Sequence, residues 1–261
     1  MTGQHTSALR TPVPANTVDR EAFRDMCRAF AEKEIGTRWK EADAERRFPR
    51  AFYEAAARTG LIGITASEDI GGAGLGAYEE AIAMEEMSKV NPNLAVAVLV
   101  QNVAGSILYE HGSAEHREIA RRTIAGECLV AITITEPDAG NDIQNVQTRA
   151  TRDGDTWILD GMKSFITLGG DADVLVTLAQ TDPALGRRGM RFFAVDRHDP
   201  NIEVSQIDTY VNRPAPTYPK AAVSKPASPR SWRASIASAS WWRPAGSVTC
   251  RPRSTGHATM P

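Results

Sequence analysis

The 261-residue sequence predicts an α+β chain, with an all-α N-terminal domain, then a small, mostly antiparallel β-domain, and then an irregular tail. Two observations support this prediction. Apolar residues recur at helical spacing over the first part of the chain and alternate with polar residues after Cys128, and this change of period separates helices from strands. The acidic residues then stop at Asp208, which marks the start of a region with a different composition.

The expected domain organisation follows from these changes of pattern. The hydrophobic content of 42 % is sufficient for a packed core, so we do not expect a disordered chain. We predict a polar leader at 1–16, a helical domain at 17–127, a β-domain at 128–218 and an irregular basic tail at 219–261.

Capping residues and helix breakers divide the helical domain. Thr17 precedes the first amphipathic run as an N-cap, Pro49 opens the second run and Gly60 closes it, and Ser113 caps the last. Helices are therefore predicted at 18–33, 50–58, 77–90, 94–111 and 114–124.

The predicted helix at 94–111 is apolar on most faces, so we expect it to lie at the centre of the domain. Gln101 and Asn102 interrupt its apolar stretch, which we judge too short to span a bilayer. We therefore expect a buried helix and no membrane span.

The β-domain is predicted from short runs with alternating apolar residues, bounded by Asp, Gly and Pro. An Asp-Gly-Asp turn at 153–155 indicates a hairpin between two of these runs. The predicted strands are 129–135, 148–151, 157–160, 174–178, 191–195 and 202–207.

The tail has the composition of neither domain. From Arg213 to Pro261 there are eight basic residues, eight prolines and no Asp or Glu. The tail lacks both clustered Lys and Arg residues and an amphipathic repeat, so binding to nucleic acid or to a membrane surface is disfavoured. We favour the interpretation that it is an out-of-frame translation of a GC-rich gene, which the downstream coding DNA would test.

Composition and motifs disfavour several other classes of protein and site. We expect no signal peptide, since residues 1–16 lack a charged region followed by an apolar run. Cys27, Cys128 and Cys250 form no CxxC pair, which favours reduced thiols in a cytoplasmic protein. The histidines have no metal-ligand spacing, and no GxSxG or HExxH motif occurs. The glycine-rich loop at 71–74 is not followed by Gly-Lys-Ser or Gly-Lys-Thr, so we interpret it as a tight connection between helices.

Two segments combine a strand with small, hydroxyl-bearing and turn-forming residues. The first runs from Ala131 to Asp142 (AITITEPDAGND), and the second runs from Gly161 to Gly170 (GMKSFITLGG). Where such a strand ends, backbone N–H groups and side-chain hydroxyls are available, which suits the edge of a planar polar cofactor. Taken alone, the stretch from Glu136 to Asn141 is equally typical of a plain strand-to-turn connection.

Together these segments resemble the two flavin-contacting segments of the acyl-CoA dehydrogenase family. The second is similar to the family pattern Gly-x-Lys-x-aromatic-Ile-Thr-Asn-Gly-Gly, except that Leu168 stands where Asn is usual. The run from His111 to Glu127 resembles the helix before the family's first strand. Asn212 to Tyr218 resembles the approach to a Phe-x-Asp-Val-x-Val-Pro strand, which does not follow here. The resemblance covers about residues 18–218.

The resemblance implies an FAD site. The backbone of the first segment and the Thr135 hydroxyl would lie against the isoalloxazine ring, Phe165 would cover one face of the ring, and Thr167 would direct its hydroxyl at N5. Asn141, where many relatives have Ser, would lie near the acyl-CoA. The implied flavin-contacting residues are Ile132, Thr133, Ile134, Thr135, Phe165, Ile166 and Thr167.

Two side chains of the second segment also have simpler interpretations. In isolation, Phe165 is more typical of a core aromatic on the inner face of a sheet. Lys163 is most simply a solvated or salt-bridged residue.

The family oxidises an acyl-CoA at its α,β bond. A Glu carboxylate removes the α-proton while the β-hydrogen leaves as hydride to flavin N5. Electrons then pass to an electron-transferring flavoprotein, and family members form homo- or hetero-oligomers. The general base lies in a C-terminal helical domain that we do not find in this sequence, and Glu136 and Asp142 cannot simply replace it. We therefore assign no catalytic residue and expect an acyl-CoA dehydrogenase-like flavoprotein that is impaired by the loss of that domain.

Two alternatives stay open. One is a non-catalytic subunit or remnant that binds a full-length homologue, and co-purification with such a chain would favour it. The other is a flavin monooxygenase or nitroalkane oxidase of the same fold, since a fold does not determine the reaction. Bleaching of the flavin by acyl-CoA without oxygen would argue against the second alternative.

Overall fold

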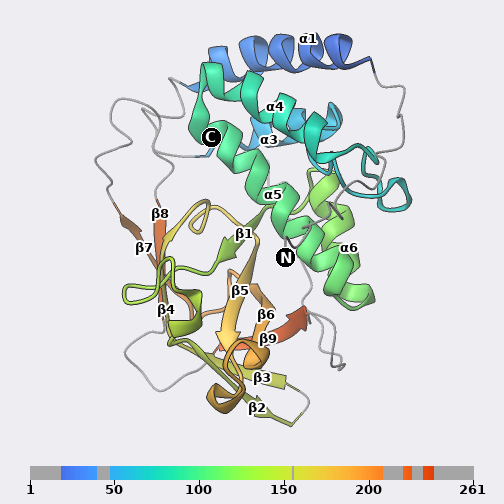
Figure 1. Ribbon diagram of the computed structural model, residues 1–261. Coiled ribbons are helices and arrows are strands. Elements are labelled where there is room, and N and C mark those ends of the chain that lie inside the picture. Colours follow the sequence, from blue (N-terminus) through green and yellow to red (C-terminus); the bar gives the residue numbers. More distant parts are fainter. Residues whose placement is uncertain (1–18, 40–47, 155, 208–219, 225–231, 238–261) are drawn as a thin grey trace, which may run out of the picture.

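The computed structural model describes residues 19–39, 48–154, 156–207, 220–224 and 232–237. Helices occupy the first part of the described chain and strands the second, as predicted. Figure 1 shows α1 and α4 at the end of the molecule opposite the β-part. The helices are α1 (Arg20–Phe30), α3 (Arg50–Arg58), α4 (Ala77–Val90), α5 (Pro92–His111) and α6 (Ala114–Ile124).

The predicted bounds of α3, α4 and α6 are confirmed. α1 differs at both ends. Asp19 caps it, because its carboxylate accepts from the backbone N–H groups of Glu21 and Ala22, both at 3.1 Å. The predicted cap, Thr17, lies outside the described residues. At its other end α1 continues into a π-helical turn, Ala31–Ile35, beyond the predicted end at residue 33.

α5 begins two residues earlier than predicted, at Pro92. The Asn91 side chain accepts from the N–H groups of Asn93 and Leu94 at 3.0 and 3.1 Å, and proline is well tolerated in the first turn of a helix. Asn91 therefore both ends α4 and starts α5.

The prediction that α5 is too short to span a bilayer is wrong. The helix has 20 residues and a mean hydropathy of 1.3 over its most apolar window, which is sufficient by length and composition alone. Half of that window is buried inside the protein, and α5 packs against α4, α6 and the first strand. Its position is that of the predicted central helix.

Two buried amides explain why polar residues interrupt this apolar helix. Gln101 donates to the Val130 carbonyl (2.8 Å) and accepts from the Val130 N–H (2.9 Å), so its amide binds the first strand as a neighbouring strand would. Asn102 accepts from the Gly63 N–H at 2.7 Å and donates to Glu80 at 3.0 Å. α5 thereby holds both the first strand and the loop that follows α3.

The strands of the described chain form two sheets, one of six strands in the order β1-β5-β2-β3-β9-β6 and one of three in the order β4-β8-β7. β6 also pairs with β5, so part of the larger sheet closes on itself. Most pairings are antiparallel, as predicted, while β5 runs parallel to β1 and β2. The strands are β1 (Val130–Thr133), β2 (Arg149–Asp153), β3 (Thr156–Asp160), β4 (Met162–Ile166), β5 (Val174–Gln180), β6 (Met190–Asp196), β7 (Glu203–Ile207), β8 (Lys220–Ser224) and β9 (Trp232–Ala237).

β8 and β9 correct the prediction of a wholly irregular tail. β8 pairs with both β4 and β7, and β9 pairs with both β3 and β6. β8 consists of Lys-Ala-Ala-Val-Ser, which has no clear alternation, so backbone pairing with two neighbours determines its conformation rather than its own pattern. The remaining parts of the predicted tail lie outside the described residues.

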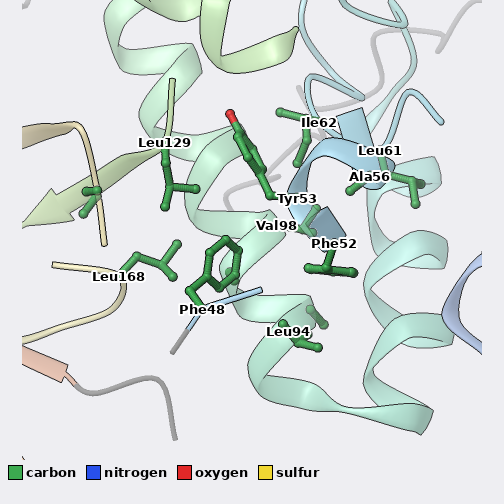
Figure 2. Close-up of a cluster of buried hydrophobic side chains, with 14 of the residues drawn as sticks. Phe48, Phe52, Tyr53, Ala56, Leu61, Ile62, Leu94, Val98, Leu129 and Leu168 are labelled. Atoms are coloured by element: carbon green, nitrogen blue, oxygen red, sulfur yellow. The ribbon is translucent and has the colours of Figure 1, made fainter. Parts of the chain in front are cut away.

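The helical part and the β-part share one hydrophobic core. Figure 2 shows Phe52 and Tyr53 of α3 near Val98 of α5, with Leu129 and Leu168 of the β-part on the other side of the cluster. The buried Tyr53 hydroxyl lies 2.6 Å from the Thr123 carbonyl oxygen and 2.9 Å from that of Cys128, and its single proton can be donated to either. α3 therefore fixes the connection between α6 and β1.

An ion pair adds a second link between the two parts. Arg50 at the start of α3 binds Asp173, which lies immediately before β5. The Asp173 carboxylate also accepts from the Leu129 N–H, at 2.8 Å. The same carboxylate thus ties α3, the start of β1 and the start of β5 together.

Gln101→Leu tests the link between α5 and β1. The substitution leaves a buried backbone N–H and a buried carbonyl of Val130 unpaired, and each costs about 1–3 kcal/mol. We expect the free energy of unfolding in urea to fall by about 2–5 kcal/mol. Val103→Ala, at an exposed position of the same helix, is the control and should cost less than about 1 kcal/mol. Equal losses for the two variants would contradict this role of Gln101.

Acid should destabilise the contact between α1 and α4. Glu86 of α4 is buried and accepts from Lys89, Arg24 and Arg28, and these bonds lower its pKa from 4.5 to about 2. The unfolded chain takes up this proton at higher pH than the folded chain, so the stability from Glu86 is present above about pH 4.5 and lost as the pH falls toward 2. We expect the melting temperature of Glu86→Gln, followed by circular dichroism, to fall less steeply over this range than that of the wild type. Parallel curves would refute the prediction.

Candidate functional site

The two segments singled out in the sequence meet where the two sheets adjoin. β1, in the six-stranded sheet, leads into the first segment, and β4, in the three-stranded sheet, lies within the second. The Ser164 N–H donates to the Thr135 carbonyl at 2.9 Å, so a backbone hydrogen bond joins the two segments directly. Residues about thirty positions apart in the sequence therefore form one local structure.

A buried ion pair joins the segments a second time. The Lys163 ammonium lies 2.6 Å from Glu136 Oε1 and donates to the Ile134 carbonyl at 3.0 Å. The side chains of Lys163 and Glu136 are 0 % and 3 % exposed. Of the two simpler interpretations of Lys163, the salt bridge is confirmed and the solvated side chain is wrong.

The Glu136 carboxylate is held from several sides. Oε1 accepts from the hydroxyl (2.5 Å) and N–H (3.0 Å) of Thr148, and Oε2 accepts from the Gln147 N–H (2.5 Å). Each oxygen thus has at least one donor, as a buried carboxylate requires.

Burial and pairing act in opposite directions on both pKa values. Burial raises the pKa of Glu136, but the bonds from Lys163, Thr148 and Gln147 outweigh it and hold the pKa below its usual range. Burial lowers the pKa of Lys163 to about 8, although Glu136 partly opposes this shift. Glu136 is therefore a carboxylate at neutral pH, and most Lys163 side chains are ammonium ions.

Gly161 explains why the second segment begins with glycine. A Cβ at this position would lie 2.3 Å from Thr148 Oγ1 and 2.7 Å from Thr148 Cα. Only a residue without a side chain allows the chain to approach Thr148 this closely, and Thr148 in turn donates to Glu136.

A β-bulge directs Phe165 outward. Lys163 pairs with Val223 of β8 and Ile166 pairs with Ala221, so Ser164 and Phe165 together oppose a single residue. Phe165 has a φ of 58°, which is unusual for a residue with a side chain, and is 51 % exposed. The alternative interpretation of Phe165 as a core aromatic is therefore wrong.

The turn after β4 contains a second unusual backbone conformation. Leu168 has a φ of 64°, and its side chain is buried in the shared core near Leu129 (Figure 2). The family's usual Asn would adopt this conformation more readily, so the buried contacts of Leu168 must offset some backbone strain.

The predicted flavin-contacting residues divide into two groups by exposure. Thr135 and Thr167 are half-buried. Ile132 and Ile134 are also half-buried, and their side chains pack against two separate hydrophobic clusters. Ile166 and Thr133 are buried, and the Thr133 hydroxyl donates to that of Thr177 at 2.6 Å. These two residues can therefore offer a ligand only their backbone groups. Asn141, the predicted substrate contact, is exposed.

Sequence reasoning missed the residues that connect the segments. Lys163 and Glu136 were noted but not paired, and Thr148 and Gln101 were given no role. One signal was present in the sequence. A lysine within a strand that is predicted to be buried requires a counter-ion. Its partner could not be identified from the sequence, because Glu136 lies 27 residues away in the chain, beyond the end of β1.

These features fit a planar aromatic cofactor better than a metal ion. An exposed aromatic ring, half-buried hydroxyls and the end of a strand lie together, which is the combination of apolar cover and polar edge that a flavin needs. Among the described residues, no group of three or more His, Cys, Asp and Glu side chains is arranged to hold a metal.

Comparison with known proteins identifies the class. The profile of the acyl-CoA dehydrogenase N-terminal domain matches residues 17–127, and that of the acyl-CoA dehydrogenase middle domain matches residues 131–219. The chain belongs to the acyl-CoA dehydrogenase family, whose members are FAD enzymes.

Individual relatives agree with this assignment. The acryloyl-CoA reductase (NADH) of Anaerotignum propionicum is 34 % identical over 197 residues, which is 74 % of this chain and 50 % of the relative. The short-chain specific acyl-CoA dehydrogenase of Clostridium acetobutylicum is 34 % identical over 194 residues, or 74 % of this chain and 51 % of the relative. The structure of a glutaryl-CoA dehydrogenase from Mycobacterium smegmatis in complex with FADH2 has a TM-score of 0.73 and 26 % identity, over 83 % of this chain and 54 % of that one. The chain spans about half the length of the curated relatives it matches.

Gly161→Ala tests the close approach to Thr148. The added methyl group has no free space, and overpacking of this kind typically costs about 1–3 kcal/mol. We expect a loss of this size in the free energy of unfolding in urea. Gly170→Ala, in the same segment but with no atom within 4 Å of the new Cβ, is the control and should change stability by less than about 0.5 kcal/mol. A Gly161→Ala variant as stable as the control would contradict the packing described here.

Proposed function

We propose that this chain provides the β-domain side of an FAD site and of an adjoining acyl-CoA site in an acyl-CoA dehydrogenase-type flavoprotein. The observation that carries the proposal is the junction of the two segments, where Phe165 is directed outward beside Thr135 and Thr167. Family membership and the FADH2 complex of the glutaryl-CoA dehydrogenase support the choice of cofactor.

Each residue has a distinct proposed role. The backbone of Ile132, Thr133, Ile134 and Ile166 and the hydroxyl of Thr135 hold the edge of the isoalloxazine ring, while Phe165 shields one face from water. Thr167 places its hydroxyl toward N5, and Asn141 lies toward the acyl-CoA. The bound FAD supplies the site that accepts hydride from the substrate.

Neither Glu136 nor Asp142 is the general base. Glu136 is buried, carries bonds from Lys163, Thr148 and Gln147, and has a lowered pKa, so it neither reaches a substrate nor takes up a proton easily. Asp142 is exposed, and its carboxylate accepts from Gln144 N–H and from the Asn145 amide at 2.6 Å. Oxidation of acyl-CoA therefore requires a base other than these two carboxylates.

This requirement also favours a second candidate function. A chain that binds flavin without a base would be a non-catalytic subunit or remnant, which binds a full-length homologue. In the dehydrogenase, electrons would pass from FAD to an electron-transferring flavoprotein. Anaerobic addition of butyryl-CoA to the FAD-loaded chain separates the two candidates, because bleaching of the flavin supports the dehydrogenase and an unchanged spectrum supports the subunit.

Phe165→Gly tests the flavin site independently of stability. Glycine adopts a φ of 58° without strain, and the lost ring is half exposed, so we expect a change in unfolding free energy of less than about 1 kcal/mol. Loss of aromatic cover should weaken FAD binding by about ten-fold, measured by quenching of flavin fluorescence.

The control for this test is Leu185→Ala, which shortens an exposed apolar side chain in the connection between β5 and β6. We expect it to leave FAD binding unchanged. Equal FAD affinity in Phe165→Gly and the control would contradict the proposed role of Phe165. A wild-type chain that binds no FAD would contradict the proposed function itself.

A further inference from the structure

The Lys163 ammonium makes more contacts than are needed to balance the charge of Glu136. Besides its ion pair with Glu136, it donates to the backbone carbonyl of Ile134 at 3.0 Å. Ile134 lies between the end of β1 and Thr135, whose carbonyl accepts from the next residue of β4, Ser164, at 2.9 Å. Two consecutive residues of β4 therefore bind two consecutive carbonyls after β1.

These contacts lie immediately before the bulge that exposes Phe165. Lys163 is the last residue of β4 in register with β8 before the irregularity, and Ile166 is the first after it. The Ser164 hydroxyl does not hold the bulge, because it is buried and finds no hydrogen-bond partner among the described residues. Anchoring before the bulge depends on the Ser164 N–H and on the Lys163 side chain.

A role in stability alone does not account for a charged pair here. Replacement of a buried ion pair by apolar residues of similar volume is often neutral or stabilising, because desolvation of the two charges offsets their attraction. A buried ion pair that also binds the backbone of a neighbouring segment fixes the position of that segment. Apolar packing determines this position less specifically.

We propose that Lys163 and Glu136 are positioning residues, which hold β4 against the end of β1 so that the bulge presents the Phe165 ring to the flavin. Glu136 orients the ammonium, and its own oxygens are fixed by Thr148 and Gln147. The part of this inference that concerns the flavin rests on the function proposed above, whereas the part that concerns the bulge does not.

The test compares the double variant Glu136→Gln/Lys163→Met with the wild type, using the full chain. The double variant removes both charges and leaves no unpaired buried ion, so native circular dichroism and a melting temperature close to that of the wild type are expected. Amide hydrogen exchange in peptides that cover 162–168 should become about ten-fold faster, which corresponds to the loss of about 1.4 kcal/mol of local stability. FAD binding should weaken by about ten-fold as Phe165 loses its fixed position.

Glu86→Gln is the matched control, because it neutralises another fully buried carboxylate at the contact between α4 and α1. It should alter neither exchange at 162–168 nor FAD affinity. Glu136→Asp is the milder second variant, because it keeps both charges but shortens the carboxylate that binds Lys163. It should give smaller changes in the same direction as the double variant.

The outcomes separate three claims: that the ion pair positions the bulge, that this position matters for FAD binding, and that the chain binds FAD. Wild-type exchange at 162–168 in a folded double variant would overturn the inference, and so would exchange that rises equally in α4. If the double variant does not fold, the same criterion applies to Glu136→Asp. Faster local exchange in a protein whose wild type binds no FAD would support the positioning of the bulge and reject the proposed function. Faster exchange with unchanged FAD affinity would reject the link between the pair and the flavin.

Discussion

A lysine ammonium buried between two sheets is the interaction on which the candidate site depends. Lys163 binds Glu136 and the Ile134 carbonyl, and so connects the three-stranded sheet with the end of the six-stranded one. A charge in such a place is stable only if its partners are fixed, and Thr148 and Gln147 fix the carboxylate. Gly161 allows Thr148 to approach, so the glycine and the lysine of the second segment serve the same junction.

Side chains of the helical part bind the strands that carry this junction. Gln101 of α5 binds the edge of β1, and Arg50 of α3 binds Asp173 at the start of β5. Leu168, two residues beyond β4, packs in the core shared with α3 and α5 (Figure 2). β1 and the end of the second segment are therefore held against the helices, while Phe165, within the second segment, remains exposed. A rigid support with an exposed aromatic ring is the arrangement expected of a preorganised cofactor site.

Local signals predicted most of the helices and strands, and non-local contacts account for the differences. Pro49, Gly60 and Ser113 are capping or breaking residues that act on their neighbours, and the bounds of α3, α4 and α6 followed from such signals. β8 has no pattern of its own and forms because β4 and β7 lie on either side of it. The two segments that were singled out in the sequence are joined by a backbone hydrogen bond in the structure. The pairing of Glu136 with Lys163 and the bulge that exposes Phe165 were not predicted, because they depend on contacts between segments that are far apart in the sequence.

An NMR titration of the Lys163 side chain, assigned by loss of its signal in Lys163→Met, tests the central claim most directly. The pKa of this ammonium should be about 8 rather than 10.5, because burial disfavours the charged form. Glu136→Gln should lower the pKa further, since the carboxylate opposes the effect of burial. A pKa of 10.5 that does not respond to Glu136→Gln would show a solvated lysine, and it would contradict a junction of the two sheets built on this ion pair.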